Sequence, residues 1–323
     1  MGIDQSRILI TGGAGFIGTH LAERFSGQAK EVILFDNGRR DSLSLAPHLR
    51  THPCIKFISG DTLDKSSVAG AFDGGIDVVL HLAAIDGVSS YYQESLKTLQ
   101  VNILGTVNVL DEAARRGIAH FVDFSTSEIF GADAMWVTEE MPCGIGASSE
   151  RRWVYATSKL ATEHFSLCYG EAHGFTATVV RPFNIYGPRQ TGEGAISNFC
   201  RAALEGKPLK VYGDGSPVRA WCYVSDMVDA IERILQVREH STGVFNIGNP
   251  REIETTLGLA RRIARLVPGT SIEFEAVSRA EVRARVPVIE RARTILGYEP
   301  KVDLEQGLNS TLQWFSKAKG AVR

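Results

Sequence analysis

The sequence predicts an α/β protein built on a doubly wound parallel sheet, and three observations support this fold class. Short runs of apolar residues recur along the first half of the chain. Segments with helical periodicity separate these runs, and glycines follow several of the segments. Strands that are apolar on both faces and alternate with helices are typical of a parallel sheet covered on both sides.

The strands are expected to follow one another at regular intervals. In chain order they span 7–10, 32–35, 55–59, 78–83, 121–125, 176–181 and 244–248. Crossover helices are expected at 20–25, 106–116 and 155–173, and Gly117 and Gly174 stand where the last two would end. Two surface helices are expected at about 253–267 and 303–319.

Beyond Pro182 the alternation becomes irregular and rich in turns, which predicts a smaller second domain interleaved with the end of the first. We expect the sheet domain to comprise residues 1–181 and 218–249. The smaller domain would comprise residues 182–217 and 250–323. A ligand is expected in the crevice between them.

Composition excludes several classes of protein. The net charge is −2, from 35 Lys and Arg against 37 Asp and Glu, so the chain lacks the basic footprint of a nucleic-acid binder. No apolar stretch is long enough for a membrane span, and the N-terminus does not resemble a signal peptide. The five cysteines form no C-x-x-C pair. We therefore expect a cytoplasmic protein with reduced thiols and no metal site.

A glycine-rich loop follows the first strand directly. Residues 11–18 read TGGAGFIG and lead into a helical segment. Glycines at 12, 15 and 18 permit a tight turn, close approach of the backbone to a pyrophosphate, and close packing of the helix on the strand. This context predicts the first turn of a Rossmann dinucleotide-binding domain.

Two carboxylates follow the next strands. Asp36 lies 18 residues past Gly18, at the end of the second strand, where it can accept hydrogen bonds from the adenosine ribose. A carboxylate there would repel a 2′-phosphate, which favours NAD over NADP, although Arg39 and Arg40 lie close by. Asp61 follows the third strand and is placed to meet the adenine; capping of a helix would explain it equally well.

A phenol and an ammonium share one face of the helix expected at 155–173. Tyr155 and Lys159 are four residues apart. An ammonium beside a phenol favours the phenolate and so makes it a better general base. Thr126 lies at the carboxyl edge of the sheet, where its hydroxyl can hold the substrate oxygen that Tyr155 deprotonates.

Taken together, these segments resemble the extended short-chain dehydrogenase/reductase family of nucleotide-sugar epimerases, dehydratases and decarboxylases. The resemblance covers residues 7 to about 317. The matching segments, besides the glycine loop and Asp36, are HLAA at 81–84, NILGTVNVLDEAAR at 102–115, FSTSEIFG at 124–131, YATSK at 155–159, RPFNIYGPRQ at 181–190 and GDGSPVRAWCYVSD at 213–226.

The resemblance implies roles for individual residues. Thr126 would be the catalytic hydroxyl, Tyr155 the base and Lys159 its partner. NAD, retained through the cycle, would contact Gly12, Gly15, Phe16, Ile17, Gly18, Asp36, Asn37, Asp61, Leu82, Ala83, Ala84, Tyr155 and Lys159. A nucleotide sugar, expected to be UDP-linked, would contact Thr126, Asn184, Arg189, Arg219 and Arg285. A homodimer through residues 95–116 and 155–173 is expected.

Three positions bear on the reaction. Glu128 occupies the place of an active-site Glu in UDP-glucuronate decarboxylases and sugar 4,6-dehydratases. Ser127 stands where many 4,6-dehydratases carry an Asp. Arg285 resembles the Arg of an Arg-x-Pro segment in glucuronate decarboxylases. The resemblance thus favours UDP-glucuronate decarboxylase with Glu128 and Arg285 as further catalytic residues, ahead of a 4-epimerase and then a 4,6-dehydratase.

The implied chemistry passes through a 4-keto sugar, which makes a carboxylate on carbon 5 a β-keto acid that loses carbon dioxide readily. Thr126, Tyr155 and Lys159 would stabilise the enolate oxygen, and the product would be a UDP-pentose. A catalytically silent NAD-sensing protein is the alternative from another class. The presence of Thr126, Tyr155 and Lys159 argues against it, because a sensor does not need an activated phenol.

Overall fold

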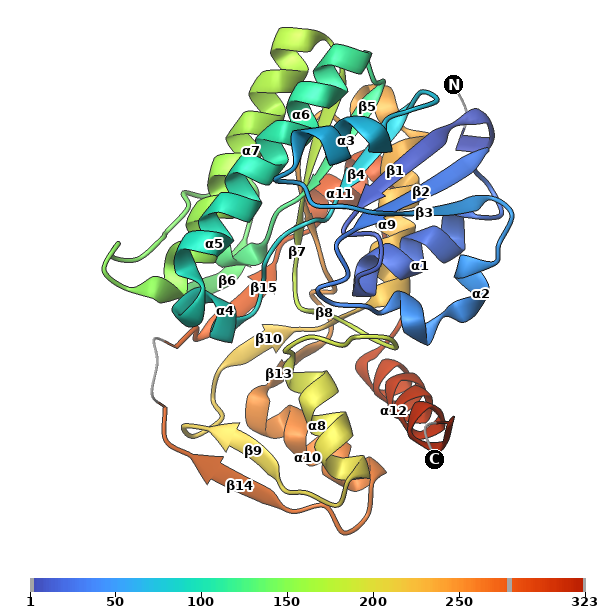
Figure 1. Ribbon diagram of the computed structural model, residues 1–323. Coiled ribbons are helices and arrows are strands. Elements are labelled where there is room, and N and C mark those ends of the chain that lie inside the picture. Colours follow the sequence, from blue (N-terminus) through green and yellow to red (C-terminus); the bar gives the residue numbers. More distant parts are fainter. Residues whose placement is uncertain (1–2, 278–280, 322–323) are drawn as a thin grey trace.

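A seven-stranded parallel sheet forms the centre of the computed structural model, which describes residues 3–277 and 281–321 (Figure 1). Its strand order is β12-β7-β5-β4-β1-β2-β3, so the direction of winding reverses between β1 and β4. The strands are β1 (Arg7–Thr11), β2 (Glu31–Asp36), β3 (Ile55–Ser59), β4 (Val78–His81), β5 (His120–Phe124), β7 (Thr176–Pro182) and β12 (Gly243–Ile247). The predicted doubly wound fold is confirmed.

Helices cover both faces of this sheet, and Figure 1 shows the two layers. One face carries α3 (Lys65–Ala71), α6 (Gly105–Arg116) and α7 (Val154–His173). The other carries α1 (Phe16–Phe25), α9 (Val224–Gln236) and α11 (Glu290–Leu296). In β1, Ile8 and Ile10 pack into one core and Leu9 into the other, which explains why the strands are apolar without alternation.

The glycines predicted to end helices do so. Gly117 and Gly174 have φ angles of 66° and 75° and follow the last residues of α6 and α7. A left-handed residue at this position turns the chain out of the helix, and glycine adopts it without steric cost. Both helices therefore end where the sequence indicated.

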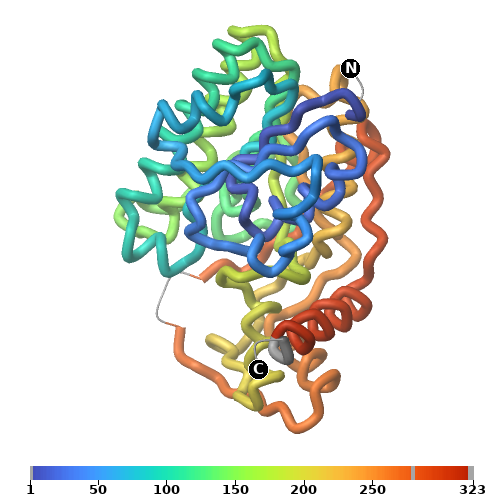
Figure 2. The backbone as a smooth tube through the Cα atoms, turned by 45° about the vertical axis from the view of Figure 1, so that its right-hand side comes forward, coloured from blue at the N-terminus to red at the C-terminus, as the bar shows by residue number. Residues whose placement is uncertain are grey.

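A second core lies below the sheet in Figures 1 and 2. Apolar side chains from α8 (Ala195–Leu204), β9 (Leu209–Tyr212), α10 (Thr256–Leu266) and α12 (Leu304–Ala321) form it, and β14 (Ile272–Glu275) pairs with β9. The helix expected at 253–267 begins later than predicted. Residues 253–255 form β13 (Ile253–Thr255), and α10 starts after Thr255, whose hydroxyl accepts a hydrogen bond from the Gly258 amide.

Small sheets join the two parts. A four-stranded sheet has the order β13-β10-β15-β6, with β10 (Val218–Ala220), β15 (Ala284–Pro287) and β6 (Asp133–Val137). A two-stranded parallel sheet is formed by β8 (Ile185–Tyr186) and β11 (Cys222–Tyr223). The expected domain boundaries stay a proposal. Two elements cross them: α11 from the C-terminal part packs in the core of the main sheet, and β6 from the N-terminal part pairs with β15.

Short helices surround these layers. They are η1 (Ile3–Gln5), η2 (Leu43–Leu45), α2 (Pro47–Arg50), α4 (Val88–Gln93), α5 (Ser95–Leu99), η3 (Gln100–Leu104), η4 (Ser127–Phe130), η5 (Arg151–Trp153) and η6 (Arg238–His240). Within the described part of the chain, no helix combines the length and the apolar character that crossing a membrane requires.

Candidate active site

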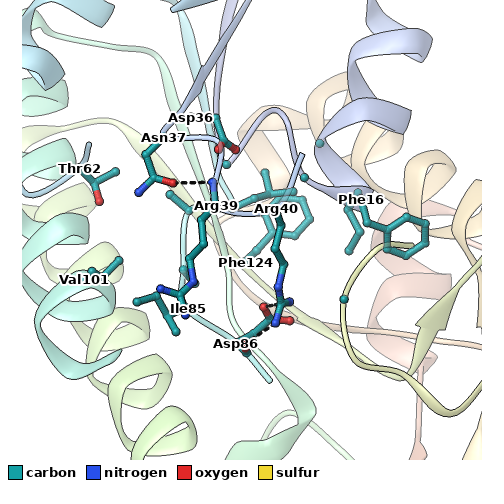
Figure 3. Close-up of a pocket in the computed structure, with 18 of the residues that line it drawn as sticks. Phe16, Asp36, Asn37, Arg39, Arg40, Thr62, Ile85, Asp86, Val101 and Phe124 are labelled. Carbon is teal, nitrogen blue, oxygen red and sulfur yellow. Dashed lines mark hydrogen bonds and ion pairs between the residues drawn. The ribbon is translucent and has the colours of Figure 1, made fainter. Parts of the chain in front are cut away.

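A cavity of about 530 Å³ opens at the carboxyl ends of the central strands (Figure 3), and residues 190–193 also line it. The geometry brings most of the predicted cofactor residues together. The lining includes Gly12, Gly15, Phe16, Ile17, Gly18, Asp36, Asn37, Asp61, Leu82, Ala83, Ala84, Thr126 and Tyr155. Lys159 lies behind this wall.

The glycine loop is shaped by close contacts with backbone. Gly12 has a φ of 69°, and a Cβ there would lie 2.8 Å from the amide nitrogen of Ala83. A Cβ on Gly18 would lie 2.7 Å from the carbonyl oxygen of Gly12. Gly15 caps α1 without a side-chain hydrogen bond, so the first amide groups of the helix are open to a ligand in the cavity. These features fit the pyrophosphate of a dinucleotide.

Asp36 stands at the end of β2 with its carboxylate held by backbone. Its Oδ1 accepts from the Gly38 amide at 2.7 Å and its Oδ2 from the Ala14 amide at 3.1 Å. Burial raises the pKa of this carboxyl above its usual value, while these two amides act in the opposite direction. The position suits the ribose hydroxyls of a dinucleotide, and a neighbouring 2′-phosphate would meet a carboxylate.

The two arginines beside Asp36 are already paired. Arg39 donates hydrogen bonds from its two Nη atoms to the Glu94 carboxylate at 3.1 and 3.0 Å. Arg40 pairs with Asp86 on the other side of the cavity, as Figure 3 shows. Because each guanidinium has a carboxylate partner, neither is left as a free cation for a 2′-phosphate. This arrangement favours NAD over NADP.

Asp61 lines the cavity and does not cap a helix. Its Oδ1 accepts from the Leu63 amide at 2.9 Å and its Oδ2 from the Asn37 side chain at 3.3 Å. The N-terminal cap of α3 is Asp64, which accepts from the amides of residues 66 and 67. The capping interpretation of Asp61 is therefore wrong, and contact with the adenine stays a prediction.

Tyr155 lies in the cavity wall, stacked on a second phenol that the sequence gave no reason to single out. Its ring centroid is 5.2 Å from that of Tyr91, and the planes differ by 9°. Burial raises the pKa of Tyr155 well above its usual value, and the carboxylates of Asp86, Glu128 and Asp123 raise it further. The phenol therefore carries its proton in this structure.

Lys159 follows Tyr155 by one helical turn and is almost wholly buried, with 1% of its side chain exposed. Its ammonium nitrogen lies 3.4 Å from Oδ1 of Asp123, whose side chain is fully buried on β5. The structure therefore adds a carboxylate to the predicted Tyr155–Lys159 pair. Sequence reasoning missed Asp123, because nothing in a single chain links positions 123 and 159.

Thr126 caps the N-terminus of η4 and Glu128 lies within it, and only Thr126 lines the cavity. The Thr126 hydroxyl accepts from the amide of Glu128 at 3.2 Å. The Glu128 carboxylate forms two hydrogen bonds, of 2.6 and 2.8 Å, with the guanidinium of Arg152. Arg152 lies over the Tyr91 ring at 5.3 Å, so it connects Glu128 to the stacked phenols.

Arg219 and Arg285 are direct neighbours on β10 and β15. Arg219 donates to the carbonyls of residues 218 and 282, and Arg285 donates to those of 131 and 284. Burial lowers the pKa of Arg219 to about 10 and that of Arg285 to about 9. Within the described part of the chain, Nη2 of Arg285 is buried without a hydrogen-bond partner.

The last two predicted substrate residues are held by other contacts. Asn184 donates to the carbonyl oxygens of Ala220 and Arg285 at 2.9 and 3.4 Å. Arg189 contacts the carboxylate of Glu23 at 2.6 Å and the ring of His20 at 2.7 Å. Like Arg219 and Arg285, neither residue is in the cavity lining, so the contacts of all four with substrate stay predictions.

The fold and the cavity define an NAD-dependent enzyme of the short-chain dehydrogenase/reductase type. The profile of the NAD dependent epimerase/dehydratase family matches residues 8–248. The chain belongs to this family, and its cofactor is NAD. Among the residues that the structure describes, no group of three or more His, Cys, Asp or Glu side chains could hold a metal ion.

Named relatives include decarboxylases. The chain is 38% identical to UDP-N-acetyl-alpha-D-glucosaminuronate decarboxylase of Bacillus cytotoxicus, with 96% of this chain and 98% of that one covered. It is 35% identical to UDP-glucuronic acid decarboxylase 1 of Danio rerio, over 97% and 73% of the chains. The UDP-glucuronic acid 4-epimerase of Bacillus cereus, solved with UDP-glucuronic acid and NAD, matches with a TM-score of 0.88 at 28% identity, over 97% and 99%.

Proposed function

We propose that the protein decarboxylates a UDP-linked uronic acid, with UDP-glucuronate as substrate and a UDP-pentose as product. One observation carries this proposal: a buried cluster with more cations than anions. Arg152, Arg219 and Arg285 all interact electrostatically with Glu128. The further carboxylates near Arg219 and Arg285 are Glu281 and Asp133, which are exposed, and Asp133 is already paired with Arg283. A buried surplus of positive charge calls for an anionic partner.

The unpaired Nη2 of Arg285 makes the partner more specific. A guanidinium nitrogen that is buried without an acceptor is costly, and a carboxylate is the acceptor that it binds best. The sugar of a UDP-uronate brings such a carboxylate on carbon 5. A neutral hexose offers only hydroxyl acceptors, which bind a guanidinium more weakly than a carboxylate does, so the cluster favours a uronate over a hexose.

The residues of the site divide the work of the reaction. When bound, NAD supplies the acceptor and later the donor of the hydride at carbon 4. Tyr155 takes the proton of the 4-hydroxyl, and Lys159 favours its phenolate. Once carbon 4 is a ketone, the C5–carboxylate bond breaks, carbon dioxide leaves and its electron pair moves to the ketone oxygen. Thr126 and Tyr155 hold that oxygen, and carbon 5 is then protonated.

One other substrate and two other reactions are compatible with the family. The relative from Bacillus cytotoxicus is named for a uronate with an N-acetyl group, which makes UDP-N-acetylglucosaminuronate a second candidate substrate. The Bacillus cereus neighbour is named for 4-epimerisation of UDP-glucuronic acid, which makes 4-epimerisation the second candidate reaction. A 4,6-dehydratase is the third, since a dTDP-glucose 4,6-dehydratase from Bacillus anthracis matches with a TM-score of 0.85 at 28% identity.

Mass spectrometry of the reaction mixture separates these possibilities. Four parallel reactions each contain the protein, NAD and one nucleotide sugar. The sugars are UDP-glucuronate, UDP-N-acetylglucosaminuronate, UDP-glucose and dTDP-glucose. Loss of carbon dioxide from a uronate is the expected result. An unchanged mass with a new sugar signal in the NMR spectrum would instead identify an epimerase. Loss of water from a neutral hexose, with inert uronates, would rule out decarboxylation.

We also propose that the enzyme is a homodimer that acts in the cytoplasm. The helices expected at the interface carry large exposed apolar side chains: Leu96 is 69% exposed, Leu104 52% and Phe165 38%. All five cysteines are free thiols, in keeping with a reducing compartment. Light scattering should give twice the mass of the chain, and the mass of one chain would refute the dimer.

A further inference from the structure

The face of α7 that packs on the sheet is polar rather than apolar. Its buried residues are Ala156, Ser158, Lys159, Thr162, Glu163, Ser166 and Gly170. A polar group leaves water at a cost unless it finds a partner inside the protein. Ser158 accepts from Asn102 of η3, and Thr162 donates to the carbonyl of Lys159 in α7 itself. The other partners come from the strands beneath α7, namely Asp123 of β5 and Arg181 of β7.

Asp123 supplies the partner nearest the catalytic pair. Its Oδ1 lies 3.4 Å from the Lys159 ammonium, and its Oδ2 accepts from the Ser166 hydroxyl at 3.2 Å. The carboxylate thus contacts two residues of α7, Lys159 and Ser166, which lie about two helical turns apart. Lys159 and Asp123 are 1% and 0% exposed, so no water screens their charges.

The other polar groups at this depth are already paired or uncharged. Glu163 binds Arg181 of β7 with hydrogen bonds of 3.0 and 2.7 Å, and it also accepts from Ser125. His81 on β4 contacts the hydroxyls of Thr11 and Thr106, and burial lowers its pKa to about 4, which leaves it neutral. Asp123 is therefore the carboxylate that balances Lys159 in the described part of the chain.

We propose that Asp123 is a positioning residue that keeps the Lys159 ammonium charged and fixed one turn from the catalytic phenol. A lysine buried without a carboxylate partner tends to lose its proton, and a neutral amine would no longer favour the phenolate. Asp123 prevents this. The negative charge of Asp123 also disfavours the phenolate form of Tyr155. Asp123 therefore acts on both Lys159 and Tyr155.

This double action predicts the pH behaviour. The charged groups that face Tyr155 are Asp86 and Arg40 from the loops over the cavity, Glu128 from η4, and Asp123 from β5. Removal of one negative charge lowers the pKa of every group near it. Without the Asp123 charge, the phenolate forms at lower pH, and the ammonium is also lost at lower pH. Both limbs of a bell-shaped rate profile should therefore move in the acid direction.

Asp123→Asn tests the proposal, since it removes the charge but keeps the shape and an acceptor oxygen. We expect both limbs of the kcat/KM profile to move to lower pH by about one unit. Glu163→Gln is the matched control, because it removes a carboxylate of a buried ion pair one turn further along α7. It should lower the unfolding temperature and leave both limbs in place. Unmoved limbs in Asp123→Asn, or equal shifts in both variants, would overturn the proposal.

The pH profile of kcat/KM rests on the proposed function, because it is measured with UDP-glucuronate as substrate. A second measurement is independent of that function. Thermal unfolding is followed for Asp123→Asn, Lys159→Met and the double variant, each loaded with NAD. Each single change leaves one buried polar group without its ionic partner, so the double variant should unfold at a higher temperature than Lys159→Met. Strictly additive losses would overturn the pairing. If UDP-glucuronate is inert but the losses are non-additive, only the proposed function fails.

Discussion

Tyr155 combines two properties that a general base must reconcile. Its ring is packed on Tyr91 inside the protein, which fixes the hydroxyl in the cavity wall. The same burial, with three carboxylates nearby, raises its pKa. The base therefore depends on positive charge being brought close to it, and Lys159 is the cation that α7 places one turn away.

Replacement of Tyr155 by Phe tests this role. The ring and its stacking on Tyr91 are kept, so NAD binding and the unfolding temperature should change little. Turnover should fall by at least about 100-fold, because general-base catalysis is lost. The measurement is product formation from UDP-glucuronate, alongside titration with NAD. Turnover close to that of the wild type would show that another group takes the proton.

Arg285 differs from the other cations of its neighbourhood because one of its nitrogens has no acceptor among the described residues. The backbone carbonyl of Gly131 holds the opposite side of the guanidinium, so the free nitrogen is fixed rather than mobile. A fixed donor discriminates strongly between a ligand that can accept its hydrogen bond and one that cannot.

Arg285→Met should therefore weaken binding selectively. A charge-assisted hydrogen bond contributes about 1.5–3 kcal/mol, which corresponds to about 10- to 100-fold in affinity. We expect that loss for UDP-glucuronate and almost none for UDP-glucose, which has no carboxylate; calorimetric titration with each nucleotide sugar measures both. Arg283→Met is the control, because Arg283 is exposed and paired with Asp133. Equal losses for the two sugars would show that Arg285 does not recognise the carboxylate.

At the scale of the elements, the central strands were predictable and the connecting ones were not. Apart from the edge strand β3, which is only partly buried, the strands of the main sheet are buried on both faces, as β1 shows with Leu9 in one core and Ile8 in the other. In contrast, β6 exposes Met135 and Trp136 and buries Ala134 and Val137, so its pattern is neither alternating nor continuous. Its partner β15 lies about 150 residues away, and no local signal indicates that pairing.

The candidate site shows the same difference between features that were predictable from the sequence and features that were not. The glycine loop and the Tyr155–Lys159 pair were predictable because their spacing within a single turn or loop has a direct geometric meaning. The contacts of Tyr91 with Tyr155, Arg152 with Glu128 and Asp123 with Lys159 join segments that are 24 to 64 residues apart. Their geometry is set by how helices pack on the sheet, which one sequence does not specify.

The glycine loop carries a prediction about the element that it starts. Gly12→Ala places a Cβ 2.8 Å from backbone of β4's following loop, at a φ of 69°. Neither the close approach to backbone nor the positive φ can be relieved by moving a side chain. We therefore expect a loss of about 2 kcal/mol in stability and at least a tenfold loss in NAD affinity. Gly27→Ala is the control, since nothing lies within 4 Å of its added Cβ. Thermal unfolding and NAD titration check both, and a Gly12→Ala variant equal to Gly27→Ala would contradict the close fit of the loop.

At the scale of the whole molecule, the sheet buries two histidines completely. His81 and His120 are 0% exposed, and burial lowers the pKa of His81 to about 4 and that of His120 to about 3. Their ordinary value of 6.5 applies in the unfolded chain. Between pH 6.5 and about 4, the unfolded chain binds protons that the folded chain does not. Stability that is complete above pH 6.5 is therefore lost as the pH falls, by about 1.4 kcal/mol per unit and per site.

His120→Gln isolates one of these sites. The Thr178 hydroxyl donates to the carbonyl of Ser241 at 2.6 Å, so it accepts from Nε2 of His120 at 2.8 Å. A glutamine amide can make that same donation without a group that titrates. Between about pH 7 and pH 5, the unfolding free energy should therefore fall less steeply in His120→Gln than in the wild type, by about 1.4 kcal/mol per unit.

Thermal or denaturant unfolding at a series of pH values measures these slopes. His48→Gln is the control, because the His48 side chain is 59% exposed and should leave the slope unchanged. A His120→Gln slope equal to that of the wild type would mean that His120 binds its proton without unfolding. The acid sensitivity would then come from the paired carboxylates of the surface and the site, because those groups lose their ion pairs when they are protonated.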